Sequence, residues 1–279
     1  MRATLGTRGF AWGFIGAASA IFLFGTILQN WLVTLLGPFV VAAGFVIAAY
    51  VSSAQHAERD FFEGFARRHR FTYLDRLALL ETTPLLGAGQ SRSCTHYMEG
   101  LLTQALPGTS CGLAWFTYET SDENSDRRGR TIETRAPHHF TVCVVDIESA
   151  MRAFPGIFLI RRRSLFRVLD GDQWLDVERL REVELESSSF QERYELFVSK
   201  SQEQNQLLRL FRPSFLVWMS EHPLEAYFEF AAGTLVVYLH QRESDSTQLD
   251  YLLEVTAFIA QSLVEQAAGQ KSASVPPVQ

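Results

Sequence analysis

A long segment near the start of the sequence lacks charge: residues 9–57 contain no Asp, Glu, Lys or Arg. This absence excludes an ordinary surface segment, because the solvent-facing side of a helix carries polar and charged residues. As one helix the run would measure about 73 Å, whereas the hydrocarbon core of a bilayer is about 30 Å thick. A single membrane span therefore does not account for the run.

Two adjacent amides, Gln29 and Asn30, divide the uncharged run. Residues 10–28 and 31–51 would each form a helix of about 30 Å, which matches the bilayer core. Asn also tolerates the left-handed conformation at a helix end, which suits a tight turn. The sequence therefore predicts a transmembrane helical hairpin within residues 1–52.

Basic residues flank the predicted hairpin on one side only. Arg2 and Arg8 precede the first span and Arg59 follows the second, whereas the tip carries no positive charge. The positive-inside rule then places both termini in the cytoplasm. Lysine is nearly absent, with copies only at Lys200 and Lys271, which is typical of a GC-rich bacterial genome. We expect a protein of the bacterial plasma membrane.

Two other interpretations of the run stay open. The first span resembles a signal peptide, with Ala18, Ser19 and Ala20 as a small-residue cleavage site, although the apolar run continues to Leu28. The two segments would also suit a buried helical pair in a soluble protein. Of the three interpretations, the hairpin agrees best with two uncharged segments of membrane-spanning length.

Small residues recur every four positions in both predicted spans. They are Gly9, Gly13 and Ala17 in the first span and Gly44 and Ala48 in the second. Such faces let helices approach closely. They either pack the two spans against each other or join copies into a homo-oligomer.

The rest of the chain is acidic, because all 31 acidic residues and all but two of the 25 basic ones follow residue 51. This balance argues against a nucleic-acid partner. The three cysteines, Cys94, Cys111 and Cys143, form no CxxC, which excludes the usual zinc and dithiol motifs. We expect ordinary reduced thiols.

Hydrophobic periodicity predicts an α+β fold, with a mostly antiparallel β domain followed by C-terminal helices. Residues 53–70 have the pattern of a helical stem, and residues 71–269 that of a cytoplasmic domain rich in short strands. A hairpin is expected to turn near Gly233, and a final helix to run from about Asp245 to Ala268. We expect residues 270–279 to form a disordered tail.

The stretch "SSSFQERYELFVSKSQ" carries a Phe-x-x-x-Tyr pattern at Phe190 and Tyr194, followed by Pro213 and a hairpin with Gly233. With the uncharged hairpin before it, this pattern resembles an uncharacterised family of actinobacterial-type membrane proteins. Their shared part is a cytoplasmic domain of unknown function. The resemblance implies the fold but no activity, cofactor or catalytic residue.

Catalytic motifs are absent from the sequence. It contains no HExxH, no Gly-x-Ser-x-Gly and no phosphate-binding loop, since Gly87-Ala88-Gly89 lacks the later Lys and Ser or Thr. Adjacent strand residues point to opposite faces, so His138 and His139 are not expected to share a metal. We therefore predict no catalytic residue, no metal and no cofactor.

One pair offers a nucleophile in principle. Cys94 and His96 lie two apart, so on a regular strand they would share a face. Chance proximity in a core strand is the better interpretation of the pair.

Arginine clusters provide the only candidate contact site. If they face an anionic membrane surface, each guanidinium would add up to about 1 kcal/mol of attraction. The alternative is that they are solvated or paired with Asp and Glu. The residues are Arg67, Arg68, Arg70, Arg161, Arg162 and Arg163.

These observations lead to three functional hypotheses. The first is an integral membrane protein whose non-catalytic cytoplasmic domain binds a protein partner or acts as a scaffold. The second is a membrane-anchored domain that senses a small molecule or lipid, and the third is an enzyme of unrecognised type. A concave pocket with converging polar groups would favour the second or third hypothesis, and an exposed apolar patch without such a pocket the first.

Overall fold

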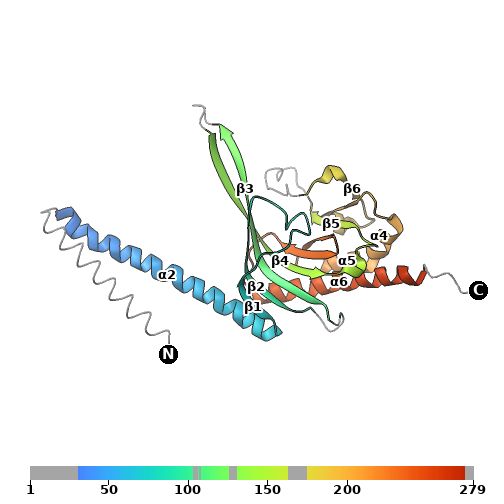
Figure 1. Cartoon of the computed structure of the whole chain (residues 1–279), viewed down its shortest axis with the longest axis horizontal. Helices are drawn as coiled ribbons and strands as arrows, with labels where there is room; N and C mark the ends of the chain where they lie inside the picture. Colours follow the sequence, from blue (N-terminus) through green and yellow to red (C-terminus); the bar gives the residue numbers. More distant parts are fainter. Residues whose placement is uncertain (1–30, 103–105, 107, 126–130, 163–174, 274–279) are drawn as a thin grey trace, which may run out of the picture. The chain divides into compact units, whose positions relative to one another are not determined.

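A computed structural model of the chain is shown in Figure 1. It describes residues 31–102, 106, 108–125, 131–162 and 175–273. The chain divides into two units, Met1–Phe61 and Phe62–Gln279. Of the predicted disordered tail, residues 270–273 belong instead to the last helix, and residues 274–279 lie outside the described residues.

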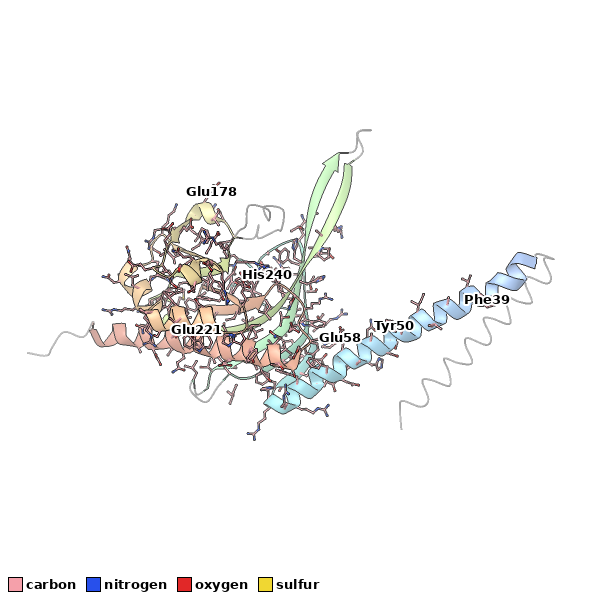
Figure 2. All side chains as sticks on the ribbon, turned by 180° about the vertical axis from the view of Figure 1, so that it is seen from behind. Phe39, Tyr50, Glu58, Glu178, Glu221 and His240 are labelled. Atoms are coloured by element: carbon pink, nitrogen blue, oxygen red, sulfur yellow. The ribbon has the colours of Figure 1, made fainter. Side chains whose placement is uncertain are left out.

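Helix α2, Trp31–His69, is 39 residues long and continues through the boundary between the two units. The apolar residues 31–51 and the charged stem that follows them therefore form one continuous helix. In the first unit, apolar side chains such as Phe39 and Tyr50 are 72% and 75% exposed (Figure 2). In the second unit, Phe62 and Phe65 of the same helix are buried.

The predicted transmembrane hairpin is wrong. Among the helices that the structure describes, none is both long enough and apolar enough to cross a membrane. The first predicted span, residues 10–28, lies outside the described residues. The finding does not support the predicted fold class, which included a transmembrane hairpin. It also does not support the predictions of an integral membrane protein and of a plasma-membrane localisation.

The second unit is built on one nine-stranded sheet in which every neighbouring pair of the described strands is antiparallel. The strand order is β1-β2-β3-β4-β9-β8-β5-β7-β6. The strands are β1 Thr72–Arg76, β2 Ser91–Leu101, β3 Ser110–Ser125, β4 Thr131–Asp146, β5 Gly156–Arg161, β6 Leu180–Val183, β7 Tyr194–Ser199, β8 Tyr227–Ala231 and β9 Thr234–Leu239. The antiparallel sheet agrees with the predicted strand pattern.

The remaining α-helices lie in the C-terminal part of the chain, and the longest, α6, contacts β4 and β9 (Figure 1). The helices are α3 Ser188–Gln191, α4 Gln204–Leu210, α5 Pro213–Glu221 and α6 Ser246–Ala273, with 3₁₀ turns η1 Glu148–Ala150 and η2 Val177–Arg179. Pro213 begins α5, where its missing N–H is not needed. The leucines and β-branched residues on the inner side of α6, such as Leu249 and Ile259, are fully buried.

The sheet has two differently covered faces, which neighbouring residues of β3 distinguish. Trp115 lies on the face that we call the helix face, where its ring contacts Phe62 of α2 at 4.9 Å between centroids. Phe116 lies on the opposite face. We call this the loop face, because it is covered by residues 77–90, the loop between β1 and β2, whose Gly89 touches the Tyr118 side chain.

A β-bulge in β2 changes which residues reach each face. Register with β3 shifts between Thr95 and Met98, and His96 has a positive φ of 52°. The extra residue turns the His96 ring to the helix face, where it stacks on Phe62, and turns Tyr97 to the loop face. Cys94 lies on the loop face with Phe116, so the expectation that Cys94 and His96 share a face is wrong.

Candidate functional site

A hollow of about 200 Å³ lies on the loop face, between the covering loop of residues 77–90 and the neighbouring ends of β2, β3 and β4. Its apolar wall comes mainly from the loop, including Leu77, Leu80 and Leu86. Its polar wall comes from the sheet, including Tyr97 and Glu99. The hollow thus has the composition of a ligand pocket, with an apolar body and a few polar groups.

The hollow forms because β3 presents small residues where its neighbours present large ones. Gly112 pairs with Glu99 on one side and with Val144 on the other, so no β3 side chain fills the space between β2 and β4. Ser110, the next β3 residue on this face, is also small. Tyr97 lies across Gly112 and closes the floor.

Tyr97 brings a polar group into this floor. Its side chain is only 8% exposed, and within the described residues its hydroxyl has no hydrogen-bond partner. Burial, with the nearby Glu99 carboxylate, raises the pKa of Tyr97 to about 12. The phenol therefore keeps its proton at neutral pH and can both donate and accept a hydrogen bond.

Two exposed carboxylates stand at the rim of the hollow. Glu99 belongs to β2 and Asp146 to β4, on either side of β3. Asp146 Oδ1 accepts a 3.0 Å hydrogen bond from the Thr234 hydroxyl. Among the described residues that line the hollow there is no Lys, Arg or His, so the rim is negative.

The covering loop is held at both sides of the apolar wall. At its start, the Leu77 amide donates to the Cys94 carbonyl over 3.4 Å. Further on, the Leu85 amide donates over 2.8 Å to a carboxylate oxygen of Glu229, a β8 residue that is completely buried. Two hydrogen bonds, one from the Leu77 amide and one from the Leu85 amide, thus fix the loop to the sheet.

Arg92 of β2 provides a further attachment of the loop. Its guanidinium pairs with the Glu81 carboxylate and donates over 2.6 Å to the Gly87 carbonyl. The middle of the apolar wall is less constrained, since Leu80 is 78% exposed. Two other exposed leucines, Leu74 and Leu101, lie on the loop face through their pairing with Tyr97 and Ser110.

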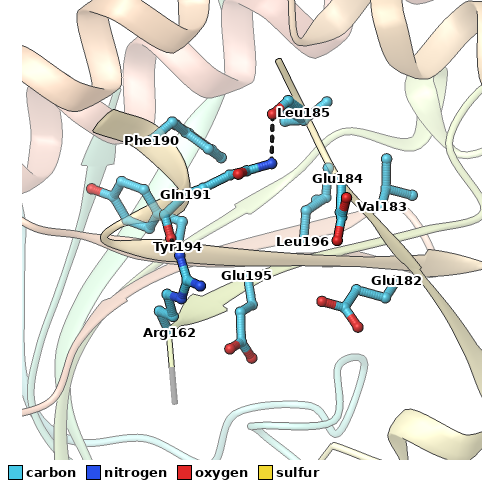
Figure 3. Close-up of a pocket in the computed structure, with 10 residues that line it drawn as sticks. All are labelled: Arg162, Glu182, Val183, Glu184, Leu185, Phe190, Gln191, Tyr194, Glu195 and Leu196. Carbon is cyan, nitrogen blue, oxygen red and sulfur yellow. Dashed lines mark hydrogen bonds between the residues drawn. The ribbon is translucent and has the colours of Figure 1, made fainter. Parts of the chain in front are cut away.

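A second hollow, of about 90 Å³, lies at the β6–β7 edge of the sheet (Figure 3). Its polar groups do not converge: Glu182 and Glu195 point to one side, and the Tyr194 hydroxyl points away from them (Figure 3). The Gln191 amide occupies the inner part and donates over 2.6 Å to the Leu185 carbonyl. This hollow is therefore a poorer candidate.

The three cysteines are free and buried. Burial raises the pKa of Cys94 to about 12. The hydrogen bond with the Cys143 thiol, together with burial, raises the pKa of Cys111 well above its ordinary value. A buried, protonated thiol is a weak nucleophile, so neither group suits nucleophilic catalysis.

The two adjacent histidines point to opposite faces, as the sequence predicts. His138 stacks on Tyr118, and His139 lies 3.1 Å from the Thr117 hydroxyl oxygen. Burial and the Arg242 charge lower the pKa of His139. Within the described residues, no group of three or more His, Cys, Asp or Glu could hold a metal ion.

The candidate arginines lie at two different elements. Arg68, in the last turn of α2, pairs with Asp250 of α6 at 3.5 Å, and its guanidinium lies over the Phe65 ring. Arg162, after β5, donates to the Gln191 carbonyl. Arg67 and Arg70 are exposed at the end of α2 and Arg161 is half-buried, whereas Arg163 lies outside the described residues. Contact of this set with a membrane surface stays a prediction.

The residues of the larger hollow were missed from the sequence. Tyr97, Glu99 and Asp146 belong to no motif, and Glu229 gave one weak signal as a charged residue between Phe228 and Phe230. What brings the first three together is strand pairing and a bulge, and neither can be read from local sequence.

Comparisons with known proteins find no relative of this chain. No protein-family model matches the chain, and searches of curated proteins and of solved structures find no match. The resemblance to actinobacterial-type membrane proteins therefore stays a prediction.

Proposed function

We propose that the second unit is a non-catalytic domain that binds a small molecule in the hollow of the loop face. The observation that carries the proposal is Tyr97, a residue that is nine-tenths buried in the wall of a 200 Å³ hollow and whose hydroxyl has no hydrogen-bond partner among the described residues. The polar groups of mostly buried side chains are normally hydrogen-bonded, so this hydroxyl is available to bond to a ligand in the hollow.

The size of the hollow limits the ligand. An apolar cavity of about 150 Å³ is sufficient to hold benzene, so a hollow of 200 Å³ suits a body of one ring or a short branched chain. A ligand with so few atoms binds with an affinity on the order of millimolar unless every contact is optimal. Such an affinity suits the sensing of an abundant metabolite.

Support for a non-catalytic role comes from the polar groups themselves. The rim carboxylates of Glu99 and Asp146 are exposed, and the buried thiol of Cys111 is protonated. A buried, protonated thiol is a weak nucleophile. The arrangement favours recognition over chemistry.

The proposal is tested with benzyl alcohol, a neutral probe that has one ring and one hydroxyl. The full chain is titrated through the millimolar range while backbone amide NMR signals are recorded. We expect saturable shifts of the Gly112 and Leu86 amides. Shifts spread evenly over the molecule, or none at the hollow, would contradict the proposal.

A filling variant makes the test specific. Ser110→Trp places a large ring at the rim, on an exposed strand position where an aromatic residue is tolerated. Ser93→Trp is the matched control, because Ser93 is also exposed in β2 but pairs with Thr117 on the helix face. The first change should abolish the shifts at Gly112, and the second should leave them intact.

A further inference from the structure

We infer that the ligand of this hollow is a small organic cation, with an apolar body under the covering loop and an ammonium-type group at the carboxylate rim. The inference rests on the proposed function and names its ligand class. It follows from the juxtaposition of Glu99 and Asp146 across a strand whose residues there, Ser110 and Gly112, are small.

The positions of the two carboxylates suit one shared positive charge. Neighbouring strands lie about 4.8 Å apart, so β2 and β4 are about 10 Å apart across β3. A cation centred over β3 therefore lies about 5 Å from each flanking strand. Glu99 pairs with Gly112, and Asp146 lies two residues further along, level with Ser110, so only small β3 side chains lie between the two carboxylates.

The charges around the rim are not balanced locally. Among the described lining residues there is no cationic side chain, and the nearby Arg92 is already paired with Glu81 and bonded to the Gly87 carbonyl. Asp146 receives one hydrogen bond from Thr234, which leaves further acceptor capacity on a carboxylate. An anion would be repelled at this rim, whereas a cation would gain two attractions.

The Tyr97 hydroxyl oxygen adds an acceptor in the floor of the hollow. An ammonium group carries three N–H donors and no acceptor, so it is matched by the two carboxylates and this oxygen. An aromatic ring in the wall attracts a cation as well.

A bare metal ion fits less well than an organic cation. Only two carboxylates lie at the rim, and no metal-binding group of three occurs within the described residues. The opposite wall consists of Leu77, Leu80 and Leu86, which offer nothing to a hydrated ion but cover an apolar body.

The test compares three probes that share one ring and differ in charge: benzylammonium, benzyl alcohol and benzoate. Each is titrated into the full chain, and the Gly112 amide shift gives the dissociation constant. An exposed ion pair changes affinity by about threefold, so benzylammonium should bind several-fold more tightly than benzyl alcohol, and benzoate should bind least. Added salt should weaken the binding of benzylammonium but not that of benzyl alcohol.

Charge-removing variants assign the effect to the rim. Glu99→Gln and Asp146→Asn should each weaken benzylammonium binding by about threefold, which is more than either change weakens the binding of uncharged benzyl alcohol. Glu186→Gln is the control, because it removes one exposed negative charge from the turn between β6 and α3. That control should leave both affinities unchanged.

The possible outcomes distinguish a failure of the cation inference from a failure of the proposed ligand-binding function. If benzyl alcohol binds as tightly as benzylammonium and the two rim variants change neither affinity, the cation inference is overturned while the hollow remains a ligand site. Tighter binding of benzoate would overturn it as well. If none of the three probes shifts the Gly112 amide, both the inference and the proposed function fail.

Discussion

The phenol of Tyr97 occupies the space that a side chain on Gly112 would need. A Cβ placed on Gly112 would come within 2.5 Å of the Tyr97 hydroxyl oxygen, which is closer than real Cβ contacts allow. The two residues come from neighbouring strands, and the β-bulge before Met98 is what turns the tyrosine towards the glycine. The floor of the hollow thus depends on one residue that lacks a side chain.

Gly112→Ala should therefore displace the Tyr97 ring and destabilise the fold. Overpacking a tight site typically lowers the free energy of unfolding by about 1–3 kcal/mol. Chemical denaturation measures this change. Gly64→Ala is the matched control, since a Cβ on Gly64 meets nothing within 4 Å and alanine favours a helix. Equal stability of both variants would show that the ring is not held against Gly112.

The buried Glu229 should hold the covering loop through the Leu85 amide. Glu229→Ala leaves that amide without its acceptor, which costs about 1–3 kcal/mol, whereas Glu229→Gln keeps an oxygen in place. Hydrogen exchange at Leu85 provides a local readout. We expect fast exchange in the alanine variant and slower exchange in the glutamine variant. Unchanged protection in the alanine variant would rule out this attachment.

The native protein should not react with a thiol reagent at pH 8. Cys94, Cys111 and Cys143 are buried, and the pKa of Cys94 is raised to about 12, so its thiolate is scarce at that pH. Addition of denaturant should expose all three thiols to an aromatic disulfide reagent, as monitored by absorbance. Rapid reaction of any one of the three in the native state would refute this expectation.

Stability should fall as the pH rises above about 10. The pKa of Tyr97 is raised to about 12 in the folded state, so the unfolded chain loses this proton first and is favoured between the two values. Tyr194, whose pKa burial also raises to about 12, contributes in the same direction. Tyr97→Phe should reduce the slope of unfolding free energy against pH in this window. An unchanged slope would argue against the buried phenol.

Elements with strong local signals were predictable from the sequence. The final helix and the hairpin at Gly233 were both predicted, and the turn has positive φ at Ala232 and Gly233, as a tight antiparallel hairpin requires. The polar stretch 121–137 has the composition of a loop. β3 and β4 nevertheless pair through it as far as Ser125 and Thr131, because the pairing is made by backbone N–H and C=O groups, which polar residues also carry (Figure 1).

The hollow could not be predicted, because it is a property of pairing between strands. Glu99 is separated from Asp146 by the whole of β3 and much of β4, and only strand register places Glu99 beside Gly112 and Asp146 level with Ser110, two residues along β3. A strict two-residue alternation would place His96 on the face of Cys94 and Tyr97 on the opposite face. The bulge at His96 exchanges these two faces. Uncharged length alone also misled the prediction for residues 9–57.

The most direct test of the ligand site is a search for intermolecular NOEs between benzylammonium and the full chain. We predict NOEs from the ring protons to Leu80 and Leu86 and from the methylene next to the nitrogen to Tyr97, all lost in the Ser110→Trp variant. NOEs to residues outside the hollow, or contacts that persist in that variant, would contradict the account.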